Sequence, residues 1–256
     1  KAHCVISVPL AAHARLVMVC DTAELLQLGA HPANLLTPDN SRQARPLLVS
    51  IAHGMSYFYS PLNPILARLS PKNIPETNFQ NDSVELAFMT LIPVFLGYIS
   101  MNLIFLFWSF WILIRAVPSA QIVRPDGALA VFCCGLLLIT NYPFKAFVWS
   151  PHTQILNILV PLLAAYILLQ RPRGKAALLA CLGAGLGMLV YGNFPILFGA
   201  IAIALLLPLQ DRLLDRPIGA RLATILAGGV VFVLPTLAWR QFVISRTGAF
   251  NVAELS

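Results

Sequence analysis

Charged residues are scarce in this chain: they make up 11% of its 256 residues, whereas 58% are hydrophobic. Soluble globular domains contain about 25% charged residues and about 45–50% apolar ones. So few charges could not cover the surface of a water-soluble fold, which excludes an ordinary soluble domain. The hydrophobic residues fall in long continuous runs rather than in alternation with polar ones. This pattern predicts membrane-spanning helices.

Cysteine, too, is limited to five residues, and no metal-ligand spacing is present, so no metal site and no cofactor is assigned. Cys133, Cys134 and Cys181 lie in apolar runs, where cysteine behaves as a small hydrophobic residue. A disulfide between Cys4 and Cys20 remains open, although an odd total argues against a disulfide framework. An initiator methionine and a signal peptide are also missing, so we expect a fragment of a longer membrane protein.

The positive charge of the chain, formally +7, does not indicate a nucleic-acid-binding protein. The Lys and Arg residues sit between the apolar runs, not on one face or in one tail. This distribution is typical of residues that set the orientation of a membrane protein. Membrane lipids are therefore the expected partners, and nucleic acid is not.

The apolar runs predict an all-α polytopic bundle of about six spans over residues 86–242. Residues 1–85 are predicted to form an outer-face segment with short interfacial helices, and 243–256 to begin a further outer loop that is truncated. Within the first segment, 4–19 is open to a second interpretation, as the end of a preceding span. The predicted spans are Leu86–Ile114, Gly127–Thr140, His152–Leu169, Ala176–Tyr191, Pro195–Leu207 and Leu222–Ala238.

The short connections between these spans differ in charge. Three alternate ones carry eight Lys or Arg residues, against three on the opposite side. Because cytoplasmic loops are enriched in Lys and Arg, the basic set is expected to be cytoplasmic. The expected location is a bacterial inner (plasma) membrane. The cytoplasmic connections would be 115–126, 170–175 and 208–221.

Chemically varied residues gather on the predicted outer side. Acidic, amide, imidazole and guanidinium groups occur there beside aromatic side chains, so this side is the expected place of function. The residues concerned are Asp21, Asp39, Arg42, Gln43, Arg45, Lys145, Trp149, His152, Gln154, Asn193 and Arg240.

Each of these residues also has a structural interpretation. Aromatic belts form at membrane interfaces without any function, and Lys145 can extend to the interface as an anchor. His152 can simply begin a helix in contact with solvent, and Asp21 can act as a helix cap. Arg42 and Arg45 suit lipid headgroups. The functional argument therefore depends on their joint placement.

The layout resembles the C-type membrane glycosyltransferases, which use sugars carried on polyprenyl phosphate. The similar segments are Val19-Cys20-Asp21-Thr22-Ala23-Glu24-Leu25, Arg42-Gln43-Ala44-Arg45-Pro46-Leu47, Trp149-Ser150-Pro151-His152-Thr153-Gln154 and Arg246-Thr247-Gly248-Ala249-Phe250. The resemblance implies an acidic residue early in the first outer loop, followed by interface-lying helices. Asp21 is followed by Thr22, so the paired acids usual in that superfamily are absent here.

The resemblance implies sugar transfer from a polyprenyl-phosphate-linked donor to an acceptor at the outer face. Asp21 is then the expected base, with Asp39 as its substitute. Four cations would hold the phosphate. The polar groups near spans three and five would bind sugar hydroxyls, with Trp149 stacking on the sugar ring. The cations are Arg42, Arg45, Lys145 and Arg240, and the polar groups are His152, Gln154 and Asn193. Gln43 is a further expected substrate-binding residue.

Two other functions are open at this point. A multispan transporter or flippase component would place ionisable residues near the bilayer midplane. The predicted span interiors hold almost none, with Asn102 and Asn157 as the polar exceptions. A non-catalytic membrane assembly subunit is the third interpretation.

Overall fold

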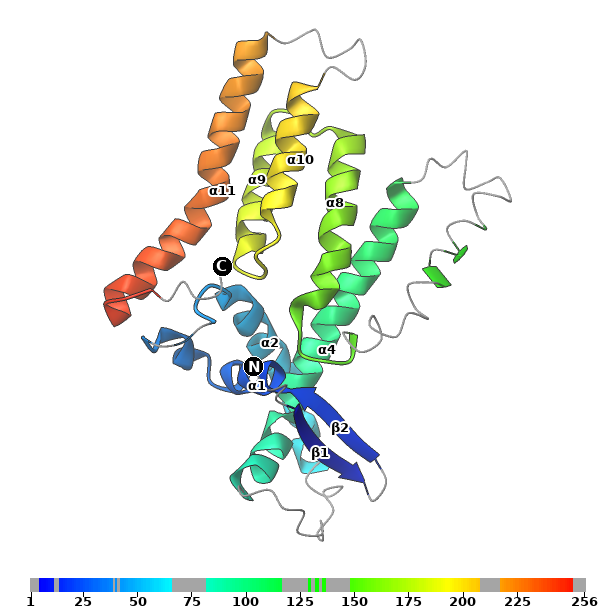
Figure 1. Ribbon diagram of the computed structural model, residues 1–256, viewed down its shortest axis with the longest axis vertical. Helices are drawn as coiled ribbons and strands as arrows, with labels where there is room; N and C mark the ends of the chain where they lie inside the picture. Colours follow the sequence, from blue (N-terminus) through cyan, green and yellow to red (C-terminus); the bar gives the residue numbers. More distant parts are fainter. Residues whose placement is uncertain are drawn as a thin grey trace.

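The computed structural model describes residues 5–11, 14–38, 40, 42–65, 82–116, 129, 132–133, 135–136, 148–207 and 217–250, with 5–21, 23 and 82–90 described by their backbone alone. The predicted span Gly127–Thr140 lies almost wholly outside these residues. Asp39 and Lys145 also lie outside the described residues. Figure 1 shows a sheaf of roughly parallel helices above a smaller part formed by the N-terminal elements.

Five helices form the sheaf, and the last four of them alternate in direction along the chain. Pro195 lies in the first turn of its helix. Proline is favourable there because a backbone N–H at this position would have no intrahelical partner. Arg171 ends a helix in the left-handed conformation at φ 48°. The helices are α4 (Asp82–Ala116), α8 (Leu156–Gln170), α9 (Lys175–Met188), α10 (Pro195–Leu206) and α11 (Ile218–Thr247).

Three helical segments are long and apolar enough to cross a membrane: Leu91–Ala116, Thr153–Gln170 and Ile218–Thr247. They coincide with the predicted first, third and sixth spans. The predicted fourth and fifth spans are helical, but α9 has 14 residues and α10 has 12. At about 1.5 Å per residue, these two helices fall short of a hydrocarbon core of about 30 Å. The structure thus indicates a membrane protein with three long apolar helices among its described residues.

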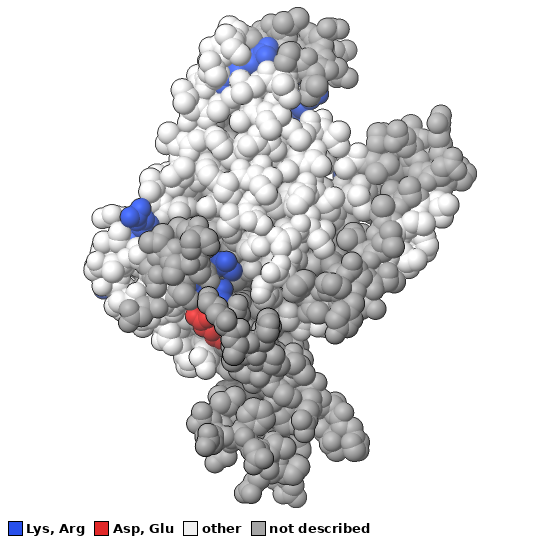
Figure 2. Space-filling view, viewed as in Figure 1, with Lys and Arg blue, Asp and Glu red and all other residues white. Residues whose placement is uncertain are grey.

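The helix ends separate into two groups. In Figure 1 the end of α4, the α8–α9 connection, the end of α10 and the start of α11 lie at the upper end of the sheaf. The connections predicted to be cytoplasmic all begin at helix ends of this group. Figure 2 shows Lys and Arg at the upper end and again near the lower end, with uncharged surface between them on this face. An uncharged band between two charged ends is the surface that a protein presents to the hydrocarbon core of a bilayer.

The N-terminal part begins with a β-hairpin, β1 (Val5–Ala11) and β2 (Ala14–Val19), in which Val5 pairs with Val19. The other described elements follow the predicted all-α class, but residues 5–19 form this hairpin and not the end of a helical span. Its β-branched residues favour extended backbone, which explains the difference. The remaining described elements of this part are helical.

Helices α1 (Cys20–Ala30) and α2 (Pro46–Tyr59), with the 3-10 turns η1 (Pro32–Leu36) and η2 (Ser60–Leu62), follow the hairpin. They pack against α4 through apolar contacts. The Tyr98 hydroxyl of α4 donates to the backbone oxygen of Leu25 at 3.0 Å. This part of the predicted outer segment is consequently a folded layer at the lower end of the sheaf.

This layer and the sheaf share one core. Its fully buried members come from α1, α2, α4 and α8, so segments far apart in sequence depend on each other for burial. They include Leu25, Leu26, Leu48, Val49, Tyr98, Ile155, Leu156 and Val160.

Candidate functional site

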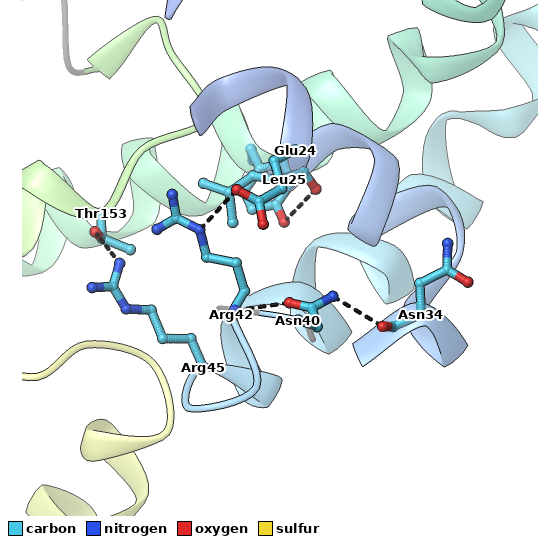
Figure 3. A network of polar contacts seen from close by, with 8 residues as sticks. Glu24, Leu25, Asn34, Asn40, Arg42, Arg45 and Thr153 are labelled. Carbon is cyan, nitrogen blue, oxygen red and sulfur yellow. Dashed lines mark hydrogen bonds and ion pairs between the residues drawn. The ribbon is translucent and has the colours of Figure 1, made fainter. Parts of the chain in front are cut away.

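A tight turn before α2 carries two arginines. Asn40 holds this turn, since its Oδ1 accepts from the Arg42 backbone N–H at 2.8 Å and its Nδ2 donates to the Asn34 oxygen at 2.9 Å. Side-chain to backbone bonds of this type are the reason that asparagine is common in turns. Figure 3 shows the side chains of Arg42 and Arg45 extending in the same direction from the turn.

Arg42 is nearly buried, with 10% of its side chain exposed. Its Nε lies 3.4 Å from Oε2 of Glu24, a residue of α1 that is 41% exposed. A charge this close to burial is stable only with an opposite charge beside it. The pair therefore fixes Arg42 against α1 and ties the turn to the rest of the layer.

Arg45 reaches the sheaf instead. Its Nη1 donates to Oγ1 of Thr153 at 3.5 Å, and its guanidinium carbon lies 5.5 Å from the centre of the Tyr191 ring. Arginine over a tyrosine face is a favourable cation–π arrangement. Arg45 thus meets both the start of the α8 segment, at η3 (Thr153–Ile155), and the turn that leads into α10.

Side-chain amides continue from Tyr191. Oδ1 of Asn157 accepts from the Tyr191 hydroxyl and from Nδ2 of Asn193, each at 2.9 Å. Nδ2 of Asn157 donates to Oε1 of Gln154 at 2.6 Å. Asn157 is exposed, so this network lies at the surface. We call Arg42, Arg45, Gln154, Asn157, Tyr191 and Asn193 the arginine–amide cluster.

Gln43 and His152 have supporting positions near the cluster. Gln43 is fully buried; its Nε2 donates to the Thr37 oxygen, and its own backbone oxygen accepts from Nε1 of Trp239 in α11 at 2.6 Å. Nδ1 of His152 accepts from the Gln154 backbone N–H at 3.3 Å, which begins η3. Both residues therefore shape the backbone around the site.

The remaining predicted site residues are Trp149, Arg240, Asp21, Asp39 and Lys145. Trp149 is 60% exposed, and Arg240 is exposed on α11. No hydrogen bond or ion pair described for this structure joins either of them to the cluster. Asp21 lies in the first turn of α1, where only its backbone is described. Asp39 and Lys145 lie outside the described residues, and in the described part of the chain no three His, Cys, Asp or Glu residues gather.

The cluster contains residues that the sequence prediction did not select. Tyr191 and Asn157 are central to it, and Glu24 and Thr153 hold its arginines. The sequence did contain a weak indication for Asn157, which is an amide in an apolar span, three residues after Gln154. Residues three apart are neighbours on a helix.

No protein-family model, no curated protein and no solved structure gives a significant match to this chain. The function of the cluster is therefore argued from its own chemistry.

Proposed function

We propose that this chain is a membrane-embedded glycosyltransferase that moves a sugar from a polyprenyl-phosphate-linked donor to an acceptor. The observation that carries the proposal is the arginine–amide cluster. It puts a guanidinium over the ring of Tyr191, whose hydroxyl bonds a group of side-chain amides, where the N-terminal layer meets helices that are long and apolar enough to cross a membrane. A lipid-linked sugar phosphate has the same three parts: an anion, hydroxyl groups and an apolar tail.

The proposal places the cluster at the outer face of a bacterial inner membrane. The connections at the opposite end of the sheaf carry eight Lys or Arg residues, against three in the connections and C-terminal tail on the side of the cluster, and such basic connections are typically cytoplasmic. Under this orientation the donor reaches the cluster from the outer leaflet. Its polyprenyl chain would stay in the bilayer beside the apolar helices.

Within the cluster, Arg45 is the proposed phosphate-binding residue. Arg42 forms an ion pair with the carboxylate of Glu24, and Arg45 reaches Thr153 and Tyr191, next to the side-chain amides of the cluster. A guanidinium offers a planar fork that matches two phosphate oxygens. Gln154 and Asn193, whose amides are fixed by Asn157, are the proposed partners of sugar hydroxyls.

Asp21 is the proposed general base. It lies three residues before Glu24 in α1, and Glu24 contacts Arg42. In the transfer, the acceptor oxygen forms a bond to the anomeric carbon and its proton passes to the carboxylate. The bond from that carbon to the phosphate oxygen breaks, and polyprenyl phosphate leaves with the electron pair. Arg45 would stabilise the charge that develops on this leaving group.

The phosphate role is tested by Arg45→Lys, which keeps the charge but loses the fork. Binding of undecaprenyl phosphate to the purified full-length protein should weaken by about tenfold or more, since a good charge-assisted bond contributes about 1.5–3 kcal/mol. Arg173→Lys is the matched control, because Arg173 is exposed at the opposite end of the sheaf. Equal affinities in the Arg45 variant and the parent protein would remove Arg45 from this role.

The catalytic role is tested by Asp21→Asn in the full-length protein, with transfer measured from radiolabelled polyprenyl-phosphate hexoses. Loss of a general base typically lowers turnover by about 10²–10⁴-fold. Binding of undecaprenyl phosphate should stay near its original value, which separates catalysis from donor binding. Unchanged turnover would show that another group takes the proton.

A further inference from the structure

Helix α2 has one face packed against the protein and one face that is exposed. Leu48, Val49 and Ala52 are buried against the core, whereas Tyr57 is 66% exposed and Phe58 is 84% exposed. From Pro46 to Ile65 the sequence has no Asp, Glu, Lys or Arg. An exposed helix face without charges is unusual in water, and large apolar surfaces of this kind mark an interaction site.

The three aromatics at the end of α2 are held in place by their neighbours. Nδ1 of His53 donates to the Gly29 oxygen of α1 at 2.7 Å, and its Nε2 bonds the Tyr57 hydroxyl at 3.1 Å. The Tyr59 hydroxyl bonds Oγ of Ser100 in α4. Phe58 stands between two anchored rings, with an edge contact to Tyr59. Its exposure is therefore built into the local structure.

The depth of α2 follows from where it crosses α4. A Cβ added at Gly97 would come 2.6 Å from the Ala52 oxygen, so the two backbones touch at this point. Arg115, in the last turn of α4, lies 18 residues after Gly97, or about 27 Å along a helix. This length is close to the hydrocarbon core of about 30 Å, so with Arg115 at one boundary of the core Gly97 lies near the other. The crossing thus falls near the boundary between headgroups and acyl chains.

We propose that the exposed face of α2 and of the residues that follow it, formed by Ile51, Tyr57, Phe58, Leu62 and Ile65, lies in the headgroup–acyl boundary of the bilayer, with Phe58 inserted among the lipids. Continuity with the apolar segment of α4 selects lipid as the occupant, because the two helices meet at membrane depth. Interfacial helices insert their apolar face by about 5–10 Å. This proposal is independent of the enzymatic one, since it needs no substrate.

Photo-crosslinking of the full-length protein tests this placement. Benzoylphenylalanine is placed at Phe58 or Ile51, the protein is reconstituted in phosphatidylethanolamine–phosphatidylglycerol vesicles, and adducts are measured by mass spectrometry after illumination. The matched control carries the probe at Ala33, an exposed position of η1. We expect phospholipid adducts at positions 58 and 51, several-fold above those at position 33.

Two results would overturn the proposal. Equal and low lipid adduct yields at all three positions would mean that α2 faces water. A protein-to-protein crosslink from position 58 without lipid adducts would mean that a second copy or another protein covers this face. Both variants change exposed side chains only, and gel filtration before illumination checks that each is folded.

Discussion

Buried amides and charges at single residues decide how the lower end of this molecule is held. Nδ2 of Asn102 in α4 donates to the backbone oxygens of Val148 and Ser150, at 3.2 and 2.8 Å. Asn102 is 1% exposed, so these bonds form away from bulk water. The segment that leads into η3, and with it Thr153, is positioned by this one side chain. Asn102 therefore acts on the cluster through the position of this segment.

Asn102→Ala should therefore destabilise the protein and loosen the cluster. Two carbonyl oxygens would lose their partner, and each buried unsatisfied group costs about 1–3 kcal/mol. We expect a thermal unfolding midpoint in detergent that is lower by several degrees. Ser109→Ala is the control, because its hydroxyl only donates to the Phe105 oxygen within α4. Equal midpoints for the Asn102 variant and the parent would contradict this role.

The helices pack through small residues at defined points rather than along a uniform stripe. The sequence Gly183, Gly185, Gly187 suggests close helix approach at all three positions. Yet a Cβ at Gly185 would come 2.2 Å from the Phe232 oxygen of α11, while one at Gly183 would meet nothing within 4 Å. At Gly187 the neighbour is the ring of Phe194. The difference between Gly183 and the other two glycines reflects which face of α9 meets its neighbours.

This difference predicts opposite effects of two alanine substitutions in the same helix. Gly185→Ala should push α9 away from α11 and cost about 1–3 kcal/mol, as overpacking typically does. Gly183→Ala should stabilise the helix by about 0.5–1 kcal/mol, because alanine loses less backbone entropy. Unfolding midpoints measured side by side provide the check, and equal shifts would exclude a close α9–α11 approach at Gly185.

The sequence predicted the elements better than their contacts. Apolar runs predicted α4, α8 and α11 because span length and composition are local properties. The hairpin at 5–19 was missed because its apolar residues resemble a short span. In the cluster, Arg42 and Arg45 were predicted, but Tyr191 and Asn157 were not. Their role comes from a turn and a helix that meet only after folding, which sequence spacing does not reveal.

At the scale of the whole molecule, two ends with different chemistry are separated by apolar helices. The upper end has the basic connections, and the lower end has the folded N-terminal layer and the arginine–amide cluster. The proposed transferase needs the lower end to face outward, whereas the proposed lipid contact of α2 is compatible with either orientation. Orientation is therefore the claim on which the proposed function depends.

The most direct test of this claim is labelling of intact cells with a membrane-impermeant thiol reagent. Single cysteines, Trp149→Cys and Arg173→Cys, are placed in a variant without the native cysteines, since both positions are exposed and lie at opposite ends. We predict labelling of position 149 in intact cells and of position 173 only after permeabilisation. Labelling of both positions from outside, or the reverse order, would contradict the account.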